Sequence, residues 1–306
     1  MKYVVAGAGG VGGSIASLLA DKGMDVTLIA RGGHYEKTRA DGLLFRRSGM
    51  DDVLLLPMPV MTADEYIEAG AAPDVIFLCV KGYSIEDMAP FLKRAAGPDT
   101  VIIPVLNGIR MGEKVRGAVP GAFVADGCIY IYAKREAPGV IWMQGDILRI
   151  VFGADLPDMD TRKLRAISDD LKSSGINADF TEDILKETMK KFSYVSTIGA
   201  AGLYFGAAAE AFQSGGAQQV FFNDLVREIG QLAEKMGIRY DFDLAAENQR
   251  IADSVEPDAT TSLQRDIAGG GRSEFDTLIM DPIRLGEKYG LEMPLYRKVA
   301  EKFGKL

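Results

Sequence analysis

Apolar residues in the first half of the chain form short runs that alternate with segments of helical period. The apolar runs predict strands over Tyr3–Ala6, Asp25–Ala30, Val75–Val80, Val101–Val105 and Phe123–Ile131. The segments of period 3.6 predict helices over Gly12–Lys22, Gly33–Ala40 and Ser84–Ala95. Because strands that alternate with helices form parallel sheets, this half is predicted to be an α/β, Rossmann-type doubly wound sheet covered by helices on both faces.

Shorter strand patterns follow in the first half of the chain, and a change to a helical period of apolar residues marks its end. Gly42–Phe45 and Asp52–Met58 predict an edge hairpin; Val140–Trp142 and Leu148–Phe152 alternate around Gly145 and predict a β-ribbon before a helix over Met159–Ser174. From about Thr181 the pattern is helical, most clearly over Ile184–Leu203, Gln218–Met236 and Pro282–Tyr289. Asp281-Pro282 is predicted to cap the last of these. We therefore expect a Rossmann-type domain over residues 1–181 and an all-α domain over 182–306.

Composition narrows the classes of function. A net charge of −8 argues against a nucleic-acid or anionic-membrane partner, because both need clustered Lys and Arg. No apolar stretch approaches the roughly 20 residues that cross a bilayer, and Cys79 and Cys128 are typical of small buried side chains in a reducing compartment. His34, the single histidine, follows the second strand and is expected at the surface. We expect a cytoplasmic protein without a histidine triad or a metal site.

A glycine motif joins the first predicted strand to the first predicted helix. The stretch Gly7-Ala8-Gly9-Gly10-Val11-Gly12 has GxGxxG spacing. The first glycine of such a motif allows a tight turn, the second lets the backbone approach a pyrophosphate, and the third lets helix and strand pack closely. The motif alone is a weak signal, but its place between a strand and a helix favours a dinucleotide site at that helix N-terminus.

Three polar side chains follow strand ends, where open parallel sheets bind ligands. Arg31 stands where NAD-binding chains carry Asp or Glu, so it indicates the 2′-phosphate of NADP; an exposed arginine is the alternative. Lys81 could contact cofactor or substrate, or be solvated. Asn107 could hold the cofactor or a substrate oxygen, or simply form an Asn-Gly turn.

Two adjacent lysines in the helical half are candidates for proton transfer. Lys191 shares its helical stripe with Thr188, Val195 and Ile198, whereas Lys190 shares a more polar one. Desolvation lowers the pKa of a lysine and makes it a usable proton donor near neutral pH, which favours Lys191. The alternative is an exposed helix pair between Glu187 and Lys191.

Together these positions resemble the ketopantoate reductase (2-dehydropantoate 2-reductase) family over essentially the whole chain. The stretches that carry the resemblance are the glycine motif, Ile29-Ala30-Arg31-Gly32, Val80-Lys81, Leu106-Asn107-Gly108, Ala137-Pro138-Gly139-Val140, Lys190-Lys191-Phe192, Ser262-Leu263-Gln264-Arg265-Asp266, Gly271-Arg272-Ser273-Glu274-Phe275-Asp276 and Arg284-Leu285-Gly286-Glu287-Lys288-Tyr289-Gly290.

The resemblance implies an NADPH-dependent reductase of a small 2-oxo acid. It places Lys191 as proton donor, Glu274 as the carboxylate that assists it, Asn107 near cofactor and substrate carbonyl, and Ser262 at the substrate carboxylate. Alternatively, Glu274 has only a structural role, as an acidic residue in the first turn of a helix. We also consider that the protein forms a homodimer.

The chain departs from the family where substrate hydroxyl groups would be held. Asparagines that follow the family's lysine by one and two turns are Val195 and Gly199 here, an Asn-Gly pair after the glutamate is Ile279-Met280, and a ribbon histidine is Met143. The expected function is reduction of 2-dehydropantoate to pantoate, for pantothenate biosynthesis. The alternatives are a different, less polar 2-oxo acid, a dehydrogenase of 3-hydroxy acids or sugar phosphates, and a non-catalytic NADPH-binding redox sensor.

Overall fold

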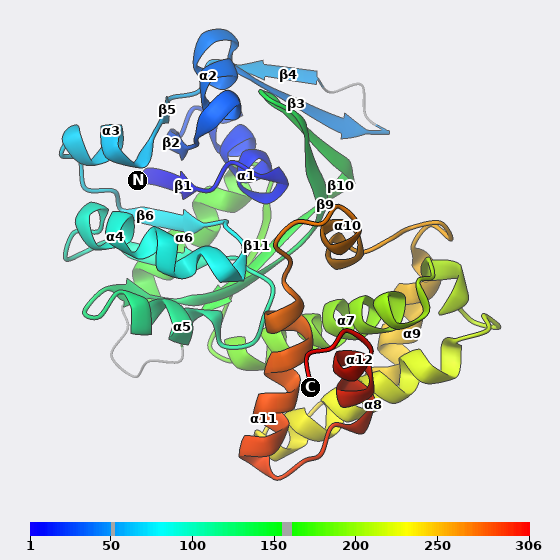
Figure 1. Ribbon diagram of the computed structural model, residues 1–306. Helices are drawn as coiled ribbons and strands as arrows, with labels where there is room; N and C mark the ends of the chain where they lie inside the picture. Colours follow the sequence, from blue (N-terminus) through cyan, green and yellow to red (C-terminus); the bar gives the residue numbers. More distant parts are fainter. Residues whose placement is uncertain (50–52, 155–160) are drawn as a thin grey trace. The chain divides into compact units, whose positions relative to one another are not determined.

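The computed structural model describes residues 1–49, 53–154 and 161–306. The chain folds into two compact units (Figure 1). Unit 1 comprises Met1–Leu106 and Arg110–Ile184, and unit 2 comprises Asn107–Ile109 and Leu185–Leu306. The sequence placed the boundary at 181/182 and did not indicate that the short segment Asn107–Ile109 belongs with the helical half.

Unit 1 contains a parallel sheet with the strand order β5-β2-β1-β6-β7-β8. Its strands are β1 (Lys2–Ala6), β2 (Asp25–Ile29), β5 (Val60–Met61), β6 (Val75–Leu78), β7 (Val101–Pro104) and β8 (Phe123–Val124). The helices of this unit are α1 (Gly10–Asp21), α2 (Gly32–Asp41), α3 (Ala63–Glu68), the 3₁₀ turn η1 (Gly82–Ser84), α4 (Ile85–Ala95), α5 (Met111–Ala118) and α6 (Thr161–Ser173). The doubly wound α/β prediction is confirmed.

Alternate residues of the sheet strands enter two different cores. In β1, Tyr3 and Val5 pack with residues of α1 and α6, whereas Val4 and Ala6 pack with residues of α3, α4 and α5. Successive side chains of a strand point to opposite faces, so a strand covered on both sides must be apolar throughout. This is why the strands of this sheet appear in the sequence as continuous apolar runs.

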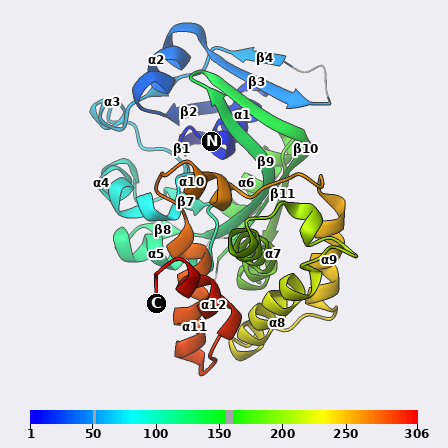
Figure 2. The same cartoon turned by 45° about the vertical axis from the view of Figure 1, so that its right-hand side comes forward.

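A second, mixed sheet of unit 1 has the order β11-β10-β3-β4, with β9 also paired to β10. Its strands are β3 (Leu43–Ser48), β4 (Val53–Leu56), β9 (Asp126–Ala137), β10 (Val140–Gly153) and β11 (Asn177–Thr181). Figure 2 shows β9 and β10 as long neighbouring strands. The antiparallel pairing of β3 with β4 confirms the predicted hairpin, although Asp52, where its second strand was expected to begin, lies outside the described residues.

Two sequence predictions for this sheet are wrong in detail, and one strand was missed. The two ribbon segments are one strand, β10, and Gly145 (φ +60°) lies at a register shift between Met143 and Leu148. The strand expected over Phe123–Ile131 is divided at Ala125 between the two sheets. Strand β11 was not predicted, and the start of the helix expected from Met159 lies outside the described residues.

The single histidine is buried, contrary to the surface position expected from the sequence. His34 lies in the first turn of α2 and is 3% exposed. The backbone N–H of Gly139, in the turn between β9 and β10, donates a hydrogen bond to its Nδ1 at 2.9 Å. Burial lowers the pKa of this imidazole, with a smaller contribution from the charge of Arg135. The ring therefore acts as a neutral acceptor that fastens the β9–β10 turn to α2.

Unit 2 is helical, as predicted, and none of its described residues forms a strand. Its elements are α7 (Ile184–Phe205), the 3₁₀ turn η2 (Ala209–Ala211), α8 (Gln219–Lys235), α9 (Leu244–Ser254), α10 (Ser262–Ala268), the π-helical turn η3 (Asp276–Met280), α11 (Asp281–Tyr289) and α12 (Pro294–Lys302). Its core joins Phe192 of α7, Phe222 of α8, Ile283 of α11 and Tyr296 of α12. Within the described ranges no helix has both the length and the apolar character needed to span a bilayer.

The predicted cap at Asp281-Pro282 is wrong. The π-helical turn η3 runs directly into α11, so Asp281 has helical backbone angles and does not begin a separate helix. Its carboxylate accepts a hydrogen bond from Arg284 at 2.8 Å. Pro282 thus lies within a continuous helix whose first turn is widened.

Candidate active site

The glycine loop between β1 and α1 is shaped by close backbone packing. Gly7 has φ +115°, and a Cβ on it would lie 2.8 Å from the carbonyl oxygen of Cys79. A Cβ on Gly12 would lie 1.9 Å from the carbonyl oxygen of Gly7. Gly10 is equally restricted, because its Cβ would lie 2.5 Å from the backbone of Ala133 in β9. This third constraint was not found from the sequence, because it depends on a strand that is distant along the chain.

Gly9 differs from its neighbours because it faces open space. A Cβ there would have no heavy atom within 4 Å. Gly9 is also the N-cap of α1, without a capping side chain, and the first turn of α1 carries no acidic residue. The N–H groups of that turn therefore keep their capacity for an anion at the positive end of the helix dipole. These features fit the pyrophosphate of a dinucleotide, with Ala8 and Val11 packed against the core beside it.

The other two predicted cofactor residues of unit 1 follow strands that end at the same sheet edge. Ala6 of β1 is in register with the ends of β2 and β6, Ile29 and Leu78. Arg31 lies just beyond β2, where it is exposed as the N-cap of α2. Lys81 lies beyond β6 as the N-cap of η1 and is half-buried. Both are therefore at the edge where Gly7 begins the glycine loop.

Unit 2 brings three of the predicted site residues together. The ammonium of Lys191, on α7, donates to Oδ1 of Asn107 at 2.8 Å. Nδ2 of Asn107 donates to Oε2 of Glu274 at 3.3 Å. Because an ammonium can only donate and a carboxylate can only accept, the two partners fix which end of the amide faces each of them. We call Lys191, Asn107 and Glu274 the lysine–amide–glutamate triad.

The triad lies in a partly desolvated environment. Glu274 is 3% exposed, and Lys191 and Asn107 are half-buried. Ionised side chains are costly to bury unless they are paired and hydrogen-bonded. The amide of Asn107 connects a cation to an anion, so each end of the triad compensates part of the burial cost of the other.

The two adjacent lysines have different surroundings. Lys190 forms an ion pair with Glu247 at 3.6 Å, and its ammonium lies 5.1 Å from the ring centroid of Phe242. Lys191 instead reaches Asn107. The stripe argument from the sequence therefore distinguished two lysines that the fold places in different environments.

Ser262 lies outside the hydrogen bonds of the triad. It is the first residue of α10, between Thr261 and Gln264, which form the capping box of this helix, and it is half-buried. Helix α10 approaches α7 closely: a Cβ on Gly199 would lie 3.3 Å from Leu263, and one on Gly202 would lie 2.6 Å from the Gln264 side chain. Glycines on α7 thus allow α10 to bring Ser262 near the helix that carries Lys191.

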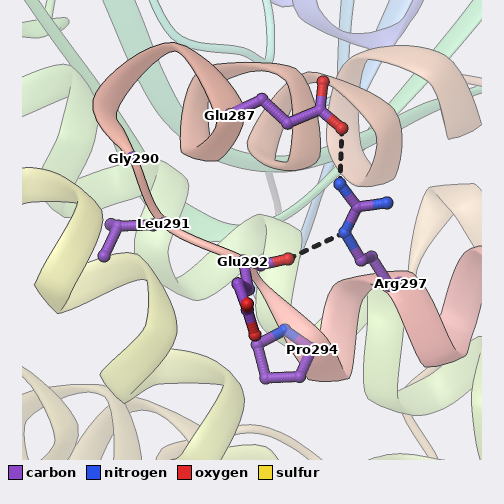
Figure 3. Close-up of a pocket in the computed structure, with 6 residues that line it drawn as sticks. All are labelled: Glu287, Gly290, Leu291, Glu292, Pro294 and Arg297. Carbon is purple, nitrogen blue, oxygen red and sulfur yellow. Dashed lines mark hydrogen bonds and ion pairs between the residues drawn. The ribbon is translucent and has the colours of Figure 1, made fainter.

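A separate pocket of about 380 Å³ lies between the end of α11 and the start of α12 (Figure 3). Its lining includes Glu287 and Arg297, which form an ion pair, and Nε of Arg297 donates to the carbonyl oxygen of Glu292 at 2.8 Å. None of the predicted site residues lines it. No group of three or more His, Cys, Asp or Glu side chains suited to a metal ion occurs among the described residues.

Two family models match the chain almost end to end. The model described as ketopantoate reductase PanE/ApbA matches residues 3–156, and its C-terminal counterpart matches residues 183–305. The chain belongs to the ketopantoate reductase family. It is therefore an oxidoreductase.

Similar proteins agree with this family assignment. The chain is 29% identical to an uncharacterized oxidoreductase, YkpB, of Bacillus subtilis, over 98% of this chain and 96% of that protein. It is 26% identical to a 2-dehydropantoate 2-reductase of Pyrococcus horikoshii, over 96% and 94%. The fold also matches a ternary structure of D-mandelate dehydrogenase with NADH and anilino(oxo)acetate, with a TM-score of 0.89 at 23% identity over 98% and 96%. Proteins with this fold thus include both a 2-dehydropantoate reductase and a mandelate dehydrogenase.

Proposed function

We propose that this protein uses NADPH to reduce a 2-oxo acid to the corresponding 2-hydroxy acid, with 2-dehydropantoate as the first substrate to test. The proposal rests on the lysine–amide–glutamate triad, in which a half-buried ammonium is held 2.8 Å from a side-chain amide. Unit 1 would bind the dinucleotide, and unit 2 would supply the proton donor. The family assignment supports the reaction class.

In this mechanism Lys191 protonates the oxygen of the substrate carbonyl. When bound, the reduced cofactor would provide the hydride that the carbonyl carbon accepts. Lys191 stabilises the negative charge that develops on the oxygen and transfers one proton to it, so the carbonyl becomes a hydroxyl group. The neutral amine then regains its proton from solvent. Hydride and proton together account for the two hydrogen atoms that the substrate gains.

The other two members of the triad hold this proton donor in place. The carbonyl of Asn107 orients the ammonium, and the carboxylate of Glu274 fixes the orientation of the amide. A buried lysine without an anion nearby tends to lose its proton, so Glu274 also favours the charged, donating form. In the same proposal Ser262 contacts the substrate carboxylate.

Cofactor binding is assigned to the glycine loop and the adjacent sheet edge. The N–H groups after Gly9 would hold the pyrophosphate, and Arg31 would pair with the 2′-phosphate that distinguishes NADPH from NADH. Lys81 and the amide of Asn107 are the other two proposed cofactor contacts. NADPH is therefore the proposed reductant.

A less polar 2-oxo acid is the second candidate substrate. Val195 and Gly199 occupy the positions on α7 where the family has asparagines, and Leu263 lies 3.3 Å from where a Cβ of Gly199 would be. An apolar surface there cannot hydrogen-bond the substrate hydroxyl of 2-dehydropantoate. The similarity to D-mandelate dehydrogenase, solved with anilino(oxo)acetate, supports an apolar or aromatic substituent.

A substrate panel tests both candidates. Purified protein is mixed with NADPH and with 2-dehydropantoate, pyruvate, 2-oxoisovalerate or phenylglyoxylate, and the loss of reduced nicotinamide absorbance is followed. The proposal expects turnover of at least one of these acids. Tight NADPH binding without turnover of any acid would contradict it and favour the sensor. The homodimer remains a prediction, which sedimentation equilibrium would test.

A further inference from the structure

The π-helical turn η3 begins two residues after Glu274. The N–H of Leu278 donates to the carbonyl oxygen of Glu274 at 2.8 Å, which is an ordinary α-helical bond. The N–H of Asp281 instead donates to the carbonyl oxygen of Asp276, five residues earlier. A π-turn accommodates one more residue than an α-turn and is frequent at functional sites. Glu274 and α11 are therefore joined through an irregular turn.

Pro282 explains why the helix is irregular at this place. In an uninterrupted α-helix the N–H of residue 282 would donate to the carbonyl oxygen of Leu278, and proline has no N–H. The proline ring would also collide with that carbonyl group. Widening the turn separates the two groups, but the Leu278 carbonyl, which is almost fully buried, needs another donor.

Ser196 on α7 supplies that donor. Its Oγ lies 2.6 Å from the carbonyl oxygen of Leu278 and 2.5 Å from the hydroxyl of Tyr296. A serine hydroxyl has one proton, so when Ser196 donates to Leu278, Tyr296 donates to Ser196. Both side chains are completely buried. The two hydroxyl groups thus form a short chain that ends on the irregular turn.

The backbone at Tyr296 is held in place by a residue of α8. The carboxylate of Glu228 accepts hydrogen bonds from the N–H groups of Leu295, at 2.7 Å, and Tyr296, at 3.3 Å. These are groups of the first turn of α12, where a carboxylate is favourable. Helices α7, α8, α12 and η3 are thus connected through one buried polar network.

We propose that Ser196 is a positioning residue for Glu274. Ser196 lies five residues after Lys191 on the same helix, so its bond to Leu278 holds the turn that follows Glu274 against the helix that carries the proton donor. Without that bond the buried Leu278 carbonyl loses its donor, so the turn, which Pro282 keeps irregular, would shift toward another partner and move Glu274 with it. The 3.3 Å bond between Glu274 and Asn107 therefore depends on Ser196.

The first test uses Ser196→Ala, with Thr197→Val as the matched control. Thr197 is equally buried, and its hydroxyl donates only to carbonyl groups of its own helix. A crystal structure of Ser196→Ala is expected to show the Glu274 carboxylate beyond hydrogen-bond distance of Asn107, with the bond kept in Thr197→Val. An unchanged bond in Ser196→Ala would overturn the proposal. This readout needs no turnover, so it stands apart from failure of the proposed reductase function.

The second test rests on the proposed function and uses kinetics. Ser196→Ala is expected to lower kcat about 10- to 100-fold, because small misplacements of catalytic groups have effects of this size, with an unchanged KM for NADPH. In a Glu274→Gln background the same change should lower kcat less than about twofold, because the two residues act through one bond. Equal losses in both backgrounds would make Ser196 merely structural and overturn the proposal. If Ser196→Ala does not fold, Tyr296→Phe replaces it: a smaller kcat loss in the same pattern supports the proposal, and none overturns it.

Discussion

The glycine loop of unit 1 and the triad of unit 2 reach their proposed functions by opposite means. The loop works through missing side chains: Gly7, Gly10 and Gly12 let backbones approach, and Gly9 leaves space for a ligand. The triad works through side chains, and its hydrogen bonds join residues 84 and 167 positions apart in the chain. A site built from backbone groups can therefore be predicted from a few consecutive residues, whereas a site built from side chains depends on the tertiary structure.

The largest expected effect concerns the triad. Lys191→Ala should lower kcat by about 10²–10⁴-fold, because it removes the proposed general acid. Lys190→Ala is the control, since that ammonium is paired with Glu247, and its kcat should change less than about threefold. Steady-state kinetics with the best acid of the panel measure both. Near-normal turnover of Lys191→Ala would move the assignment to Lys190 or Lys81.

The second largest effect is a difference in stability between substitutions at two glycines of the loop. Gly12→Ala should destabilise the protein by about 3 kcal/mol, because its methyl group would meet the Gly7 carbonyl at 1.9 Å. Gly9→Ala has room for its methyl group and should leave the free energy of unfolding within about 0.5 kcal/mol of the original.

The same pair separates stability from binding. Gly9→Ala should nevertheless weaken NADPH binding about tenfold, or about 1.4 kcal/mol, because the methyl group enters the proposed pyrophosphate space. Urea unfolding and calorimetric titration measure the two quantities. If Gly9→Ala bound NADPH as tightly as the original protein, the pyrophosphate would not lie across this residue.

Arg31 tests cofactor choice. Arg31→Ala should raise KM for NADPH about 10- to 100-fold, since a hydrogen bond to a charged group contributes about 1.5–3 kcal/mol. KM for NADH should stay the same, because NADH lacks the 2′-phosphate. NADH therefore serves as the control for the Arg31→Ala variant. Equal changes for both cofactors would show that Arg31 does not select between them.

The smallest effect is a pH dependence of stability. The pKa of His34 is lowered in the folded state by burial, so the unfolded chain binds more protons below the ordinary value of 6.5. Its contribution to stability is complete above pH 6.5 and is lost as the pH falls through the folded pKa. Urea unfolding between about pH 7.5 and 5 should show this slope, and His34→Gln should lack it. An NMR titration of this single histidine that gave a pKa above 6.5 would contradict the expectation.

The sequence predicts those parts of the fold that are locally determined. The strands of the parallel sheet are apolar on both faces, so continuous runs such as Val75–Val80 mark them. Strand β11 and the continuity of β10 were missed, because their pairing is set by distant partners and Gly145 imitates a turn. Likewise, His34 was expected at the surface because it follows the second strand, whereas in the structure it is buried and bonded to the β9–β10 turn.

The site divides in the same way. Helical spacing singled out Lys191 over Lys190, but its hydrogen bond to Asn107 comes from tertiary structure. The roles of Glu274 and Ser262 came from family resemblance, whereas Asn107 was also singled out by its place after the fifth predicted strand. Pro282 indicated an irregular helix. The sequence could not show that Ser196, on a distant helix, donates a hydrogen bond to the carbonyl group that this proline leaves without a donor.

The contact between Gly199 and Leu263 limits how this chain could evolve. A Cβ at 199 would lie 3.3 Å from Cδ2 of Leu263, so a side chain there requires the leucine to move by a few tenths of an ångström. Replacing Leu263 with a smaller residue first would remove this crowding, whereas Gly199→Asn alone gives a more tightly packed intermediate. The order of these two mutations therefore affects how much packing strain the single-mutant intermediate carries.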